Sequence, residues 1–214
     1  MSKVFHIDPE NPSAEVINLA ASILRDGGVV LFPTETVYGI GASSDSWYGA
    51  QELFDIKMRP PGKPLPWLVE DGDALDRYGV DVPAYAHALA KRFWPGELTI
   101  VVGASDLVGR DFRDGRGTVA LRCSSHEVVQ ELIRASGRPI ASTSANTTGV
   151  PPVARFEELE PRILAAADVV LDAGEAHVGV ASTVVDCTGP EPVVLREGAI
   201  PADEVLAGAH ALDS

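Results

Sequence analysis

The stretch VVLFPTETVYGIGA, residues 29–42, decides the fold class. Its first four residues are branched or aromatic, which is the composition of a buried β-strand. Pro33 ends that strand, because proline has no N–H to offer to a sheet. Just before it, residues 13–26 carry apolar positions at helical spacing, and Ser13 is placed to cap that helix. A helix that leads directly into a buried strand is typical of α/β proteins.

The same alternation continues along the chain. It predicts helices at 46–56, 83–93, 126–135, 155–166 and 202–208, and strands at 65–69, 98–103, 117–121, 139–142, 168–171, 182–187 and 192–195. Strands interleaved with helices predict a single-domain α/β fold with an open, twisted β-sheet and flanking helices. The closely spaced strands near the C-terminus favour a mixed sheet over a purely parallel one.

Composition excludes several classes of protein. The 214 residues include 17 Lys and Arg against 31 Asp and Glu, a formal charge of −14, which argues against nonspecific coating of nucleic acid. The N-terminus lacks the apolar core of a signal peptide, and no stretch approaches the roughly 18 apolar residues of a membrane helix, so we expect a cytoplasmic protein. Cys123 and Cys187 are expected to be free thiols, and the scattered histidines predict no zinc site.

A basic loop, KMRPPGKPL at residues 57–65, is the strongest candidate for binding an anion. Lys57, Arg59 and Lys63 fall within seven positions, and three prolines stiffen the loop, which lowers the entropy lost when the cations are held on a ligand. Residues 57–122 hold 10 basic and 9 acidic residues, whereas the remainder holds 7 basic and 22 acidic. Because positive charge is concentrated there, we predict a local polyphosphate site rather than a solvated loop.

Small polar side chains gather at three further predicted strand ends. They lie in PTETVYG (33–39), RPIASTSANTTG (138–149) and VASTVVDCTG (180–189), and Gly39 and Gly41 are expected to let the backbone turn closely after the first strand. Such hydroxyls and amides can bind phosphate, ribose or carboxylate oxygens, although each group alone could be a turn that satisfies its own backbone. The chain has no Walker A loop, Rossmann fingerprint or nucleophile elbow, so the polyphosphate site lacks a P-loop.

Seven short motifs follow one another along the chain. They are PTETVYGIGA (33–42), K-x-R-P-x-x-K-P-L (57–65), W-P-G-x-L-T (94–99), T-V-A-L-R (118–122), S-A-N-x-T-G (144–149), S-T-V-V-D (182–186) and R-E-G-A-I (196–200). Together they resemble the YrdC-like family of threonylcarbamoyl-AMP synthases. The resemblance implies an enzyme that condenses L-threonine, bicarbonate and ATP to threonylcarbamoyl-adenylate and pyrophosphate. It also implies a partner transferase complex that modifies tRNA, with little or no direct tRNA binding by this chain.

The resemblance also implies roles for particular residues. The ATP-binding residues would be Lys57, Arg59, Lys63, Thr118, Ser144, Asn146, Pro152 and Arg196, and the threonine-binding residues would be Thr36, Arg122, Ser142 and Ser182. Lys57 and Arg59 would act in catalysis, and Mg²⁺ would be bound through the ATP phosphates with no metal site on the protein. The domains would be an N-terminal extension (1–12), a YrdC-like catalytic domain (13–208) and a C-terminal tail (209–214), as in the short form without an extra C-terminal domain.

Two substitutions depart from the pattern of many members. Leu68 stands at the position of a histidine, and Ser124 stands at the position of a proline. Two alternative functions stay open: an RNA-binding module of the same fold, which would use the basic surface of residues 57–122, and a carbamoyl-adenylate-forming relative with a different substrate, which Leu68 leaves open. Dependence of pyrophosphate release on threonine separates both alternatives from the synthase.

Overall fold

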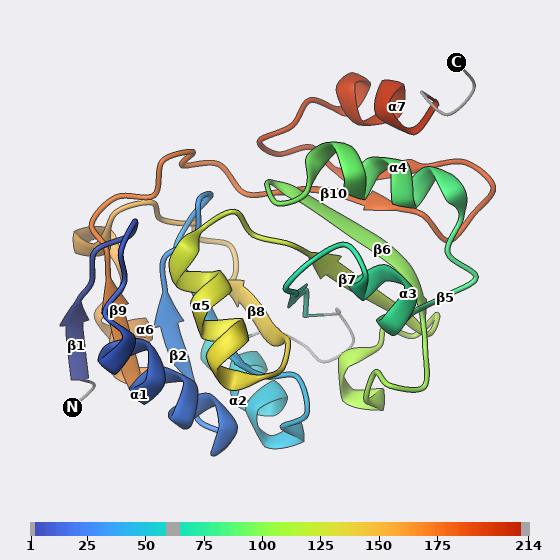
Figure 1. Cartoon of the computed structure of the whole chain (residues 1–214). Coiled ribbons are helices and arrows are strands. Elements are labelled where there is room, and N and C mark those ends of the chain that lie inside the picture. Colours follow the sequence, from blue (N-terminus) through green and yellow to red (C-terminus); the bar gives the residue numbers. More distant parts are fainter. Residues whose placement is uncertain (1–2, 59–64, 211–214) are drawn as a thin grey trace.

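The structure is a computed structural model and describes residues 3–58 and 65–210. The chain folds around one mixed β-sheet, which confirms the predicted α/β class (Figure 1). In spatial order the strands are β1 (Lys3–His6), β9 (Val169–Asp172), β2 (Val30–Phe32), β3 (Gly39–Ser43), β8 (Ile140–Ser144), β4 (Trp67–Leu68), β7 (Thr118–Arg122), β6 (Leu98–Ala104), β10 (Thr183–Asp186) and β11 (Val193–Arg196). The short strand β5 (Gly79–Val80) pairs with β6 away from this path.

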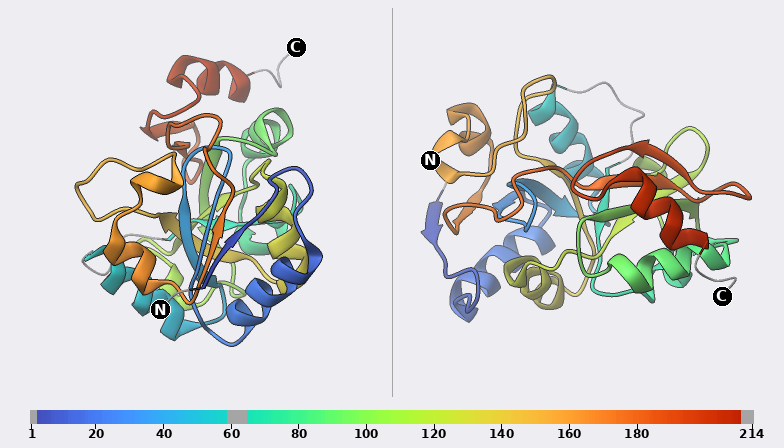
Figure 2. Two further views of the ribbon diagram at one scale, coloured as in Figure 1. Left: turned by 90° about the vertical axis from the view of Figure 1, so that its left-hand side faces the viewer. Right: turned by 90° about the horizontal axis from the view of Figure 1, so that it is seen from above.

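Helices cover both faces of the sheet (Figure 2). They are α1 (Ala14–Arg25), α2 (Trp47–Lys57), α3 (Ala74–Tyr78), α4 (Ala84–Phe93), α5 (Glu127–Ser136), α6 (Pro161–Ala166) and α7 (Ala202–His210), with two 3₁₀ turns at Arg110–Phe112 and Phe156–Glu158. The apolar faces of α1 and α5 form one core with β2, β8 and β9, and the other helices belong to a larger core on the opposite face. None of the helices within the described ranges is long and apolar enough to cross a membrane.

The alternation of side chains along β7 separates the larger core from a polar surface. Val119 and Leu121 are fully buried in that core, whereas Thr118, Ala120 and Arg122 line a cavity on the other face. Neighbouring residues of a strand point to opposite faces of the sheet, so this pattern follows directly from the T-V-A-L-R sequence. The cavity therefore lies on the face that also carries α1 and α5.

Two of the helix predictions need correction. The helix expected at 155–166 is replaced by a 3₁₀ turn and the short helix α6, which begins at Pro161. Proline fits the first turn of a helix but not its interior, so a continuous helix through this position is unfavourable. Ser13 does occupy the N-cap of α1, but its side chain makes no capping hydrogen bond.

The sequence did not predict the strands β1, β3 and β5 or the helix α3. The stretch expected to form a turn contains β3, which pairs antiparallel with β2 and β8. Gly41 lies inside this strand, and a Cβ there would lie 2.7 Å from Cγ2 of Ile140. The glycine is therefore explained by close packing between strands rather than by a turn. At the sheet edge, β1 pairs parallel with β9 through residues 3–6.

His126 caps the helix α5. Its Nδ1 accepts a hydrogen bond from the N–H of Val128 at 3.3 Å, and the residue is 9% exposed. Burial, with a smaller contribution from the neighbouring His177, lowers the pKa of His126 despite the opposing effect of Glu35. The neutral imidazole is the form that can accept the capping bond, so protonation opposes folding.

We expect the free energy of unfolding to fall as the pH drops below about 6.5, the ordinary histidine pKa. The folded chain holds His126 neutral while the unfolded chain takes up a proton, so stability is lost in that window. His126→Asn keeps a capping side chain without this titration. When denaturant unfolding is measured between pH 5 and 8, the free energy of unfolding should depend less steeply on pH in this variant than in the original chain. An unchanged dependence on pH would contradict the role of His126.

Thr183 fastens the segment 196–200 to the start of β10. Its hydroxyl donates to the carbonyl of Ile200 at 2.6 Å and accepts the N–H groups of Gly198 at 2.9 Å and Ile200 at 3.1 Å. The approach is close, because a Cβ at Gly198 would lie 2.1 Å from the carbonyl oxygen of Ala181. The S-T-V-V-D and R-E-G-A-I motifs are thus parts of one contact.

Gly198→Ala should destabilise the fold by about 1–3 kcal/mol, the usual cost of overpacking, because the atoms in the way belong to the backbone. Gly72→Ala is the matched control, since a Cβ there meets nothing within 4 Å, and it should change stability by no more than about 0.5 kcal/mol. Urea unfolding of both variants makes the comparison. If the two variants unfolded with equal free energies, the segment 196–200 would have to be able to shift and accommodate the added methyl group.

Candidate active site

A cavity of about 500 Å³ lies on the polar face of the sheet. Seven of the predicted site residues line it, namely Thr36, Thr118, Arg122, Ser142, Ser144, Ser182 and Arg196. They come from β7, β8, β11 and the segments that precede β3 and β10. The fold therefore brings together residues that are far apart in the sequence.

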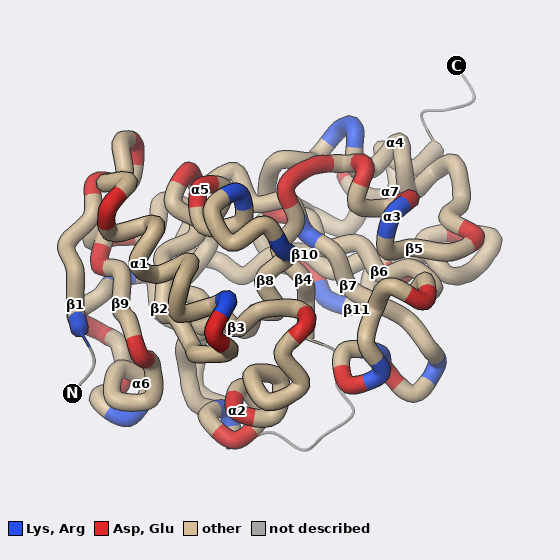
Figure 3. Tube along the Cα trace, turned by 60° about the horizontal axis from the view of Figure 1, so that its bottom comes forward, with Lys and Arg blue, Asp and Glu red and all other residues tan. Residues whose placement is uncertain are grey.

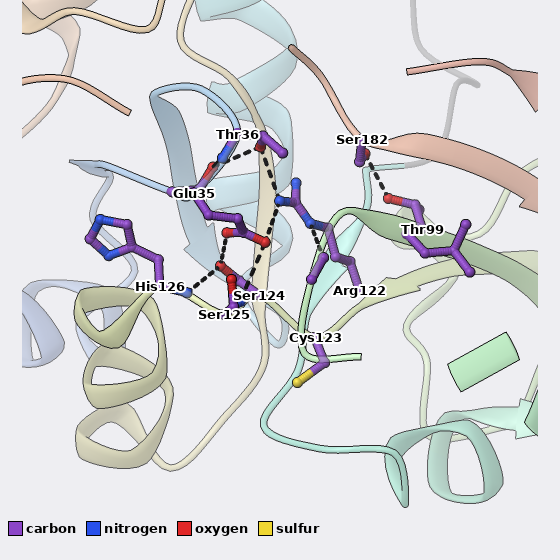
Figure 4. A network of polar contacts seen from close by, with 12 residues as sticks. Glu35, Thr36, Thr99, Arg122, Cys123, Ser124, Ser125, His126 and Ser182 are labelled. Carbon is purple, nitrogen blue, oxygen red and sulfur yellow. Dashed lines mark hydrogen bonds and ion pairs between the residues drawn. The ribbon is translucent and has the colours of Figure 1, made fainter. Parts of the chain in front are cut away.

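Arg122 enters the cavity from the end of β7 with its guanidinium fixed on three sides (Figure 4). Its Nη2 forms an ion pair with Oε1 of Glu35 at 2.8 Å and donates to Oγ1 of Thr36 at 3.0 Å. Its Nε donates to the carbonyl of Gly96 at 3.1 Å. Nη1 makes no hydrogen bond to the described residues, so it is the nitrogen left for a ligand.

Glu35 holds this arrangement in place. It belongs to the polar groups of the PTETVYG stretch, but the sequence assigned it no particular role in the site. The side chains of Glu35 and Arg122 are 8% and 9% exposed. The second carboxylate oxygen of Glu35 accepts a hydrogen bond from the hydroxyl of Ser124, and the N–H of Ser125 donates to the first at 3.3 Å. Such a buried charge is tolerated only when it is paired and hydrogen-bonded, as it is here. A carboxylate inside a hydroxyl-rich motif was the available signal.

Arg196 is the second cation of the cavity. Its Nη2 and Nε donate to the carbonyl of Ser182 at 2.7 and 3.2 Å, and the Ser182 hydroxyl contacts that of Thr99 at 2.9 Å. Burial, with the nearby positive charge of Arg122, lowers the pKa of Arg196. No carboxylate of the described chain lies within ion-pair distance of it. The charge of Arg196 therefore favours binding of an anion.

Charged positions of both signs are spread over the chain. Figure 3 shows Lys and Arg on β1, α2, α3, α5 and α6 as well as beside β7 and β10, with acidic positions among them. The positive charge of the cavity therefore comes from the particular side chains that line it.

Lys57 lies beside the cavity, at the last residue of α2. It is 5% exposed, and its ammonium donates to the carbonyl and hydroxyl of Ser144 at 2.8 and 3.3 Å and to Oδ1 of Asn146 at 3.1 Å. Lys57 thus contacts both Ser144 and Asn146, and all three were predicted to bind ATP. Lys57 does not line the cavity itself, whereas Ser144 does. The buried ammonium provides positive charge at the end of β8.

The three predicted residues that remain are Arg59, Lys63 and Pro152. Arg59 and Lys63 lie outside the described residues. Pro152 is exposed and is not among the residues that line the cavity.

Thr118 is buried in the cavity wall with a polar group unused. The residue is 3% exposed, and its hydroxyl has no hydrogen-bond partner among the described residues. Asp114 and Arg116, which belong to none of the seven motifs, line the cavity next to it.

Comparison with known proteins identifies relatives. The family profile described as Telomere recombination, covering Sua5, YciO and YrdC proteins, matches residues 22–198. The chain is 40% identical over 189 residues to the threonylcarbamoyl-AMP synthase of Pyrococcus abyssi, covering 88% of this chain but 56% of that protein. It thus spans little more than half the length of that relative.

Solved structures show the same fold. The chain superposes on the crystal structure of P. abyssi Sua5 complexed with L-threonine with a TM-score of 0.90 and 36% identity, covering 97% of this chain and 61% of that one. It superposes on Escherichia coli YciO with a TM-score of 0.88 and 30% identity, covering 96% and 100%. The matched profile and the identity of these relatives show that the chain belongs to the Sua5/YciO/YrdC family.

Proposed function

We propose that this chain is a threonylcarbamoyl-AMP synthase that condenses L-threonine, bicarbonate and ATP to threonylcarbamoyl-adenylate and pyrophosphate. One observation carries the proposal: a single cavity combines Arg122, aimed by a buried carboxylate, with Arg196, which has no carboxylate partner among the described residues. Such a cavity suits two anionic substrates. The name of the P. abyssi relative and the L-threonine bound in its structure support the same reading.

The threonine-binding residues that we propose are Thr36, Arg122, Ser142 and Ser182. In this proposal Nη1 of Arg122 donates to the threonine carboxylate, because its other two donor nitrogens are already occupied. Fixing the guanidinium in advance reduces the entropy lost when the substrate binds. The catalytic unit that we propose spans residues 13–208, and the edge strand β1 lies outside it.

The nucleotide-binding residues that we propose are Lys57, Arg59, Lys63, Thr118, Ser144, Asn146, Pro152 and Arg196. The carbamate formed from the threonine amine and bicarbonate attacks the α-phosphorus of ATP, and the bond to the β-phosphate breaks as pyrophosphate leaves. Positioning and neutralisation of the phosphate charge are the tasks of the protein in such a step. We assign the catalytic contribution to the cations Lys57 and Arg59.

We propose that Mg²⁺ reaches the site on the ATP phosphates. The described residues at the nucleotide end are cations, hydroxyls and an amide, a donor set that fits phosphate oxygens better than a metal ion. We also propose that the product passes to a tRNA-modifying transferase complex in the cytoplasm. With a formal charge of −14, the chain is poorly suited to bind tRNA by itself.

Pyrophosphate release should require ATP, L-threonine and bicarbonate together, and mass spectrometry should detect threonylcarbamoyl-adenylate. Release without threonine would instead support a relative with a different substrate. Tight, salt-sensitive tRNA binding without any release would support the RNA-binding module. Either result would overturn the synthase assignment.

Arg196→Gln should raise the KM for ATP by about 10- to 100-fold, the range for loss of a hydrogen bond from a charged group, with a much smaller effect on the KM for threonine. Arg110→Gln is the matched control, because Arg110 is exposed on the 3₁₀ turn outside the cavity lining. Steady-state kinetics with each substrate varied in turn would separate the two constants. A larger effect on threonine would place Arg196 in the amino-acid subsite.

A further inference from the structure

Residues 146–148, which follow β8, contact Lys57 at both of its ends. Oδ1 of Asn146 accepts a hydrogen bond from the Lys57 ammonium at 3.1 Å. At the backbone, the hydroxyl and the N–H of Thr148 donate to the carbonyl of Lys57 at 2.7 and 3.3 Å. The position of the buried ammonium therefore depends on the conformation of the segment 146–148.

Glu160 holds this segment from the start of α6. One of its carboxylate oxygens accepts the N–H of Thr147 at 2.7 Å, and the other accepts the Thr147 hydroxyl at 2.7 Å. Nη2 of Arg162 donates to the same hydroxyl at 2.8 Å. Hydrogen bonds to an ionised carboxylate are stronger than those between neutral groups. Because Thr147 lies at the centre of the segment, Glu160 restrains the residues on either side of it.

The backbone of Glu160 is itself anchored. Leu159 and Ile163, one on each side of it, are 4% and 0% exposed and belong to the larger core. The carbonyl of Glu160 accepts the N–H groups of Ile163 and Leu164 at 2.9 and 3.0 Å. Pro161 follows in the first turn of α6, where its fixed φ favours the helix. The carboxylate therefore extends from a backbone that is held in place.

The charge of Glu160 has an effect opposite to that of its hydrogen bonds. The hydrogen bonds from Thr147 lower the pKa of Glu160 against a smaller effect of burial, and the positive charges of Arg162 and Lys57 lower it further. Glu160 is therefore ionised at neutral pH, and its negative charge offsets part of the field of Lys57. The hydrogen bonds hold the ammonium in place for an anion, whereas the charge weakens the attraction of that anion.

Glu160 can act on a ligand only through other residues. Of the described residues in this network, Ser144 lines the cavity, whereas Glu160 and Thr147 do not. The Lys57 ammonium donates to the carbonyl of Ser144 at 2.8 Å, so the network reaches the cavity wall at that residue.

We propose that Glu160 is a positioning residue for the phosphates of the nucleotide, because it holds Thr147 and thereby the segment that fixes Lys57. The inference rests on the proposed function, which takes Lys57 as a phosphate-binding residue. It deepens that function by giving α6 a role in the site. Glu160 belongs to none of the seven motifs, and the sequence around it predicted only a helix.

Calorimetric titration of the full chain with inorganic tripolyphosphate tests the proposal. Glu160→Ala should raise the Kd for tripolyphosphate about ten-fold, the scale for loss of a hydrogen bond to a charged group. Glu160→Gln should leave the Kd unchanged or lower it by up to about five-fold, because the amide keeps an acceptor for the N–H and a donor for the hydroxyl while the opposing charge is lost. Glu158→Ala is the matched control, since Glu158 is exposed on the preceding 3₁₀ turn. It should change the Kd less than about two-fold.

A second background shows whether the effect passes through Lys57. In Lys57→Gln, the further substitution Glu160→Ala should change the Kd for tripolyphosphate less than about two-fold, because no ammonium is left to position. A role limited to stability would give the same loss in both backgrounds. In steady-state kinetics, Glu160→Ala should raise the KM for ATP and leave that for threonine within about two-fold.

Thr147→Val tests the same contact if Glu160→Ala does not fold. It removes the hydroxyl but keeps the hydrogen bond from the N–H, so it should raise the Kd for tripolyphosphate by about three-fold, less than Glu160→Ala. Thermal unfolding of each variant shows whether it is folded.

Three results would overturn the proposal. The first is an unchanged Kd for tripolyphosphate in folded Glu160→Ala or, in its place, in Thr147→Val. The second is a loss in Glu160→Gln as large as that in Glu160→Ala, and the third is an equal loss in the Lys57→Gln background. An original chain that does not bind tripolyphosphate would overturn the phosphate site and this proposal together.

The titrations need no turnover, so they separate the inference from the proposed reaction. If pyrophosphate release fails while Glu160→Ala still weakens tripolyphosphate binding, the reaction is wrong and the role of Glu160 holds. If release succeeds and Glu160→Ala has no effect, the reaction holds and the role of Glu160 is wrong.

Discussion

The buried ion pair between Glu35 and Arg122 is the interaction on which the site depends. It joins the segment after β2 to the end of β7, and in the sheet β3, β8 and β4 lie between those two strands. Taking two charges out of water is expensive, and leaving either one unpaired costs about 3–5 kcal/mol. The neighbouring donors from Ser124 and Ser125 and the carbonyl of Gly96 are therefore needed together.

The rest of the cavity follows from this constraint. Once Arg122 is fixed at the end of β7, the alternation of that strand puts Thr118 on the same face, toward the other end of the cavity. The paired strand β6 and its neighbour β10 supply Thr99 and Val184 to the same surface. The cavity is thus a stretch of sheet surface whose polar side chains come from a regular pattern.

The sequence was informative where a signal is local. Alternating apolar segments predicted the α/β class and most elements, and seven of the predicted site residues do line one cavity. The strand β3 was not predicted because its sequence, GIGAS, is rich in small residues with weak strand preference. Its position is decided by pairing with β2 and β8. The role of Glu35 was not predicted for another reason, because its partner Arg122 lies 87 residues away in the sequence. No local pattern reports such a pair.

The pairing of Arg122 also bears on how the two proposed substrates would respond to ionic strength. A carboxylate that approaches Arg122 meets a guanidinium already neutralised by Glu35, so little net charge attracts it from a distance. Arg196, in contrast, donates to the carbonyl of Ser182 and forms no ion pair with the described residues, so its charge can attract an anion. Added salt screens long-range attraction far more than contacts inside a buried site. In the proposed function, the amino acid is thus recognised chiefly by contact, and the nucleotide is also drawn in by charge.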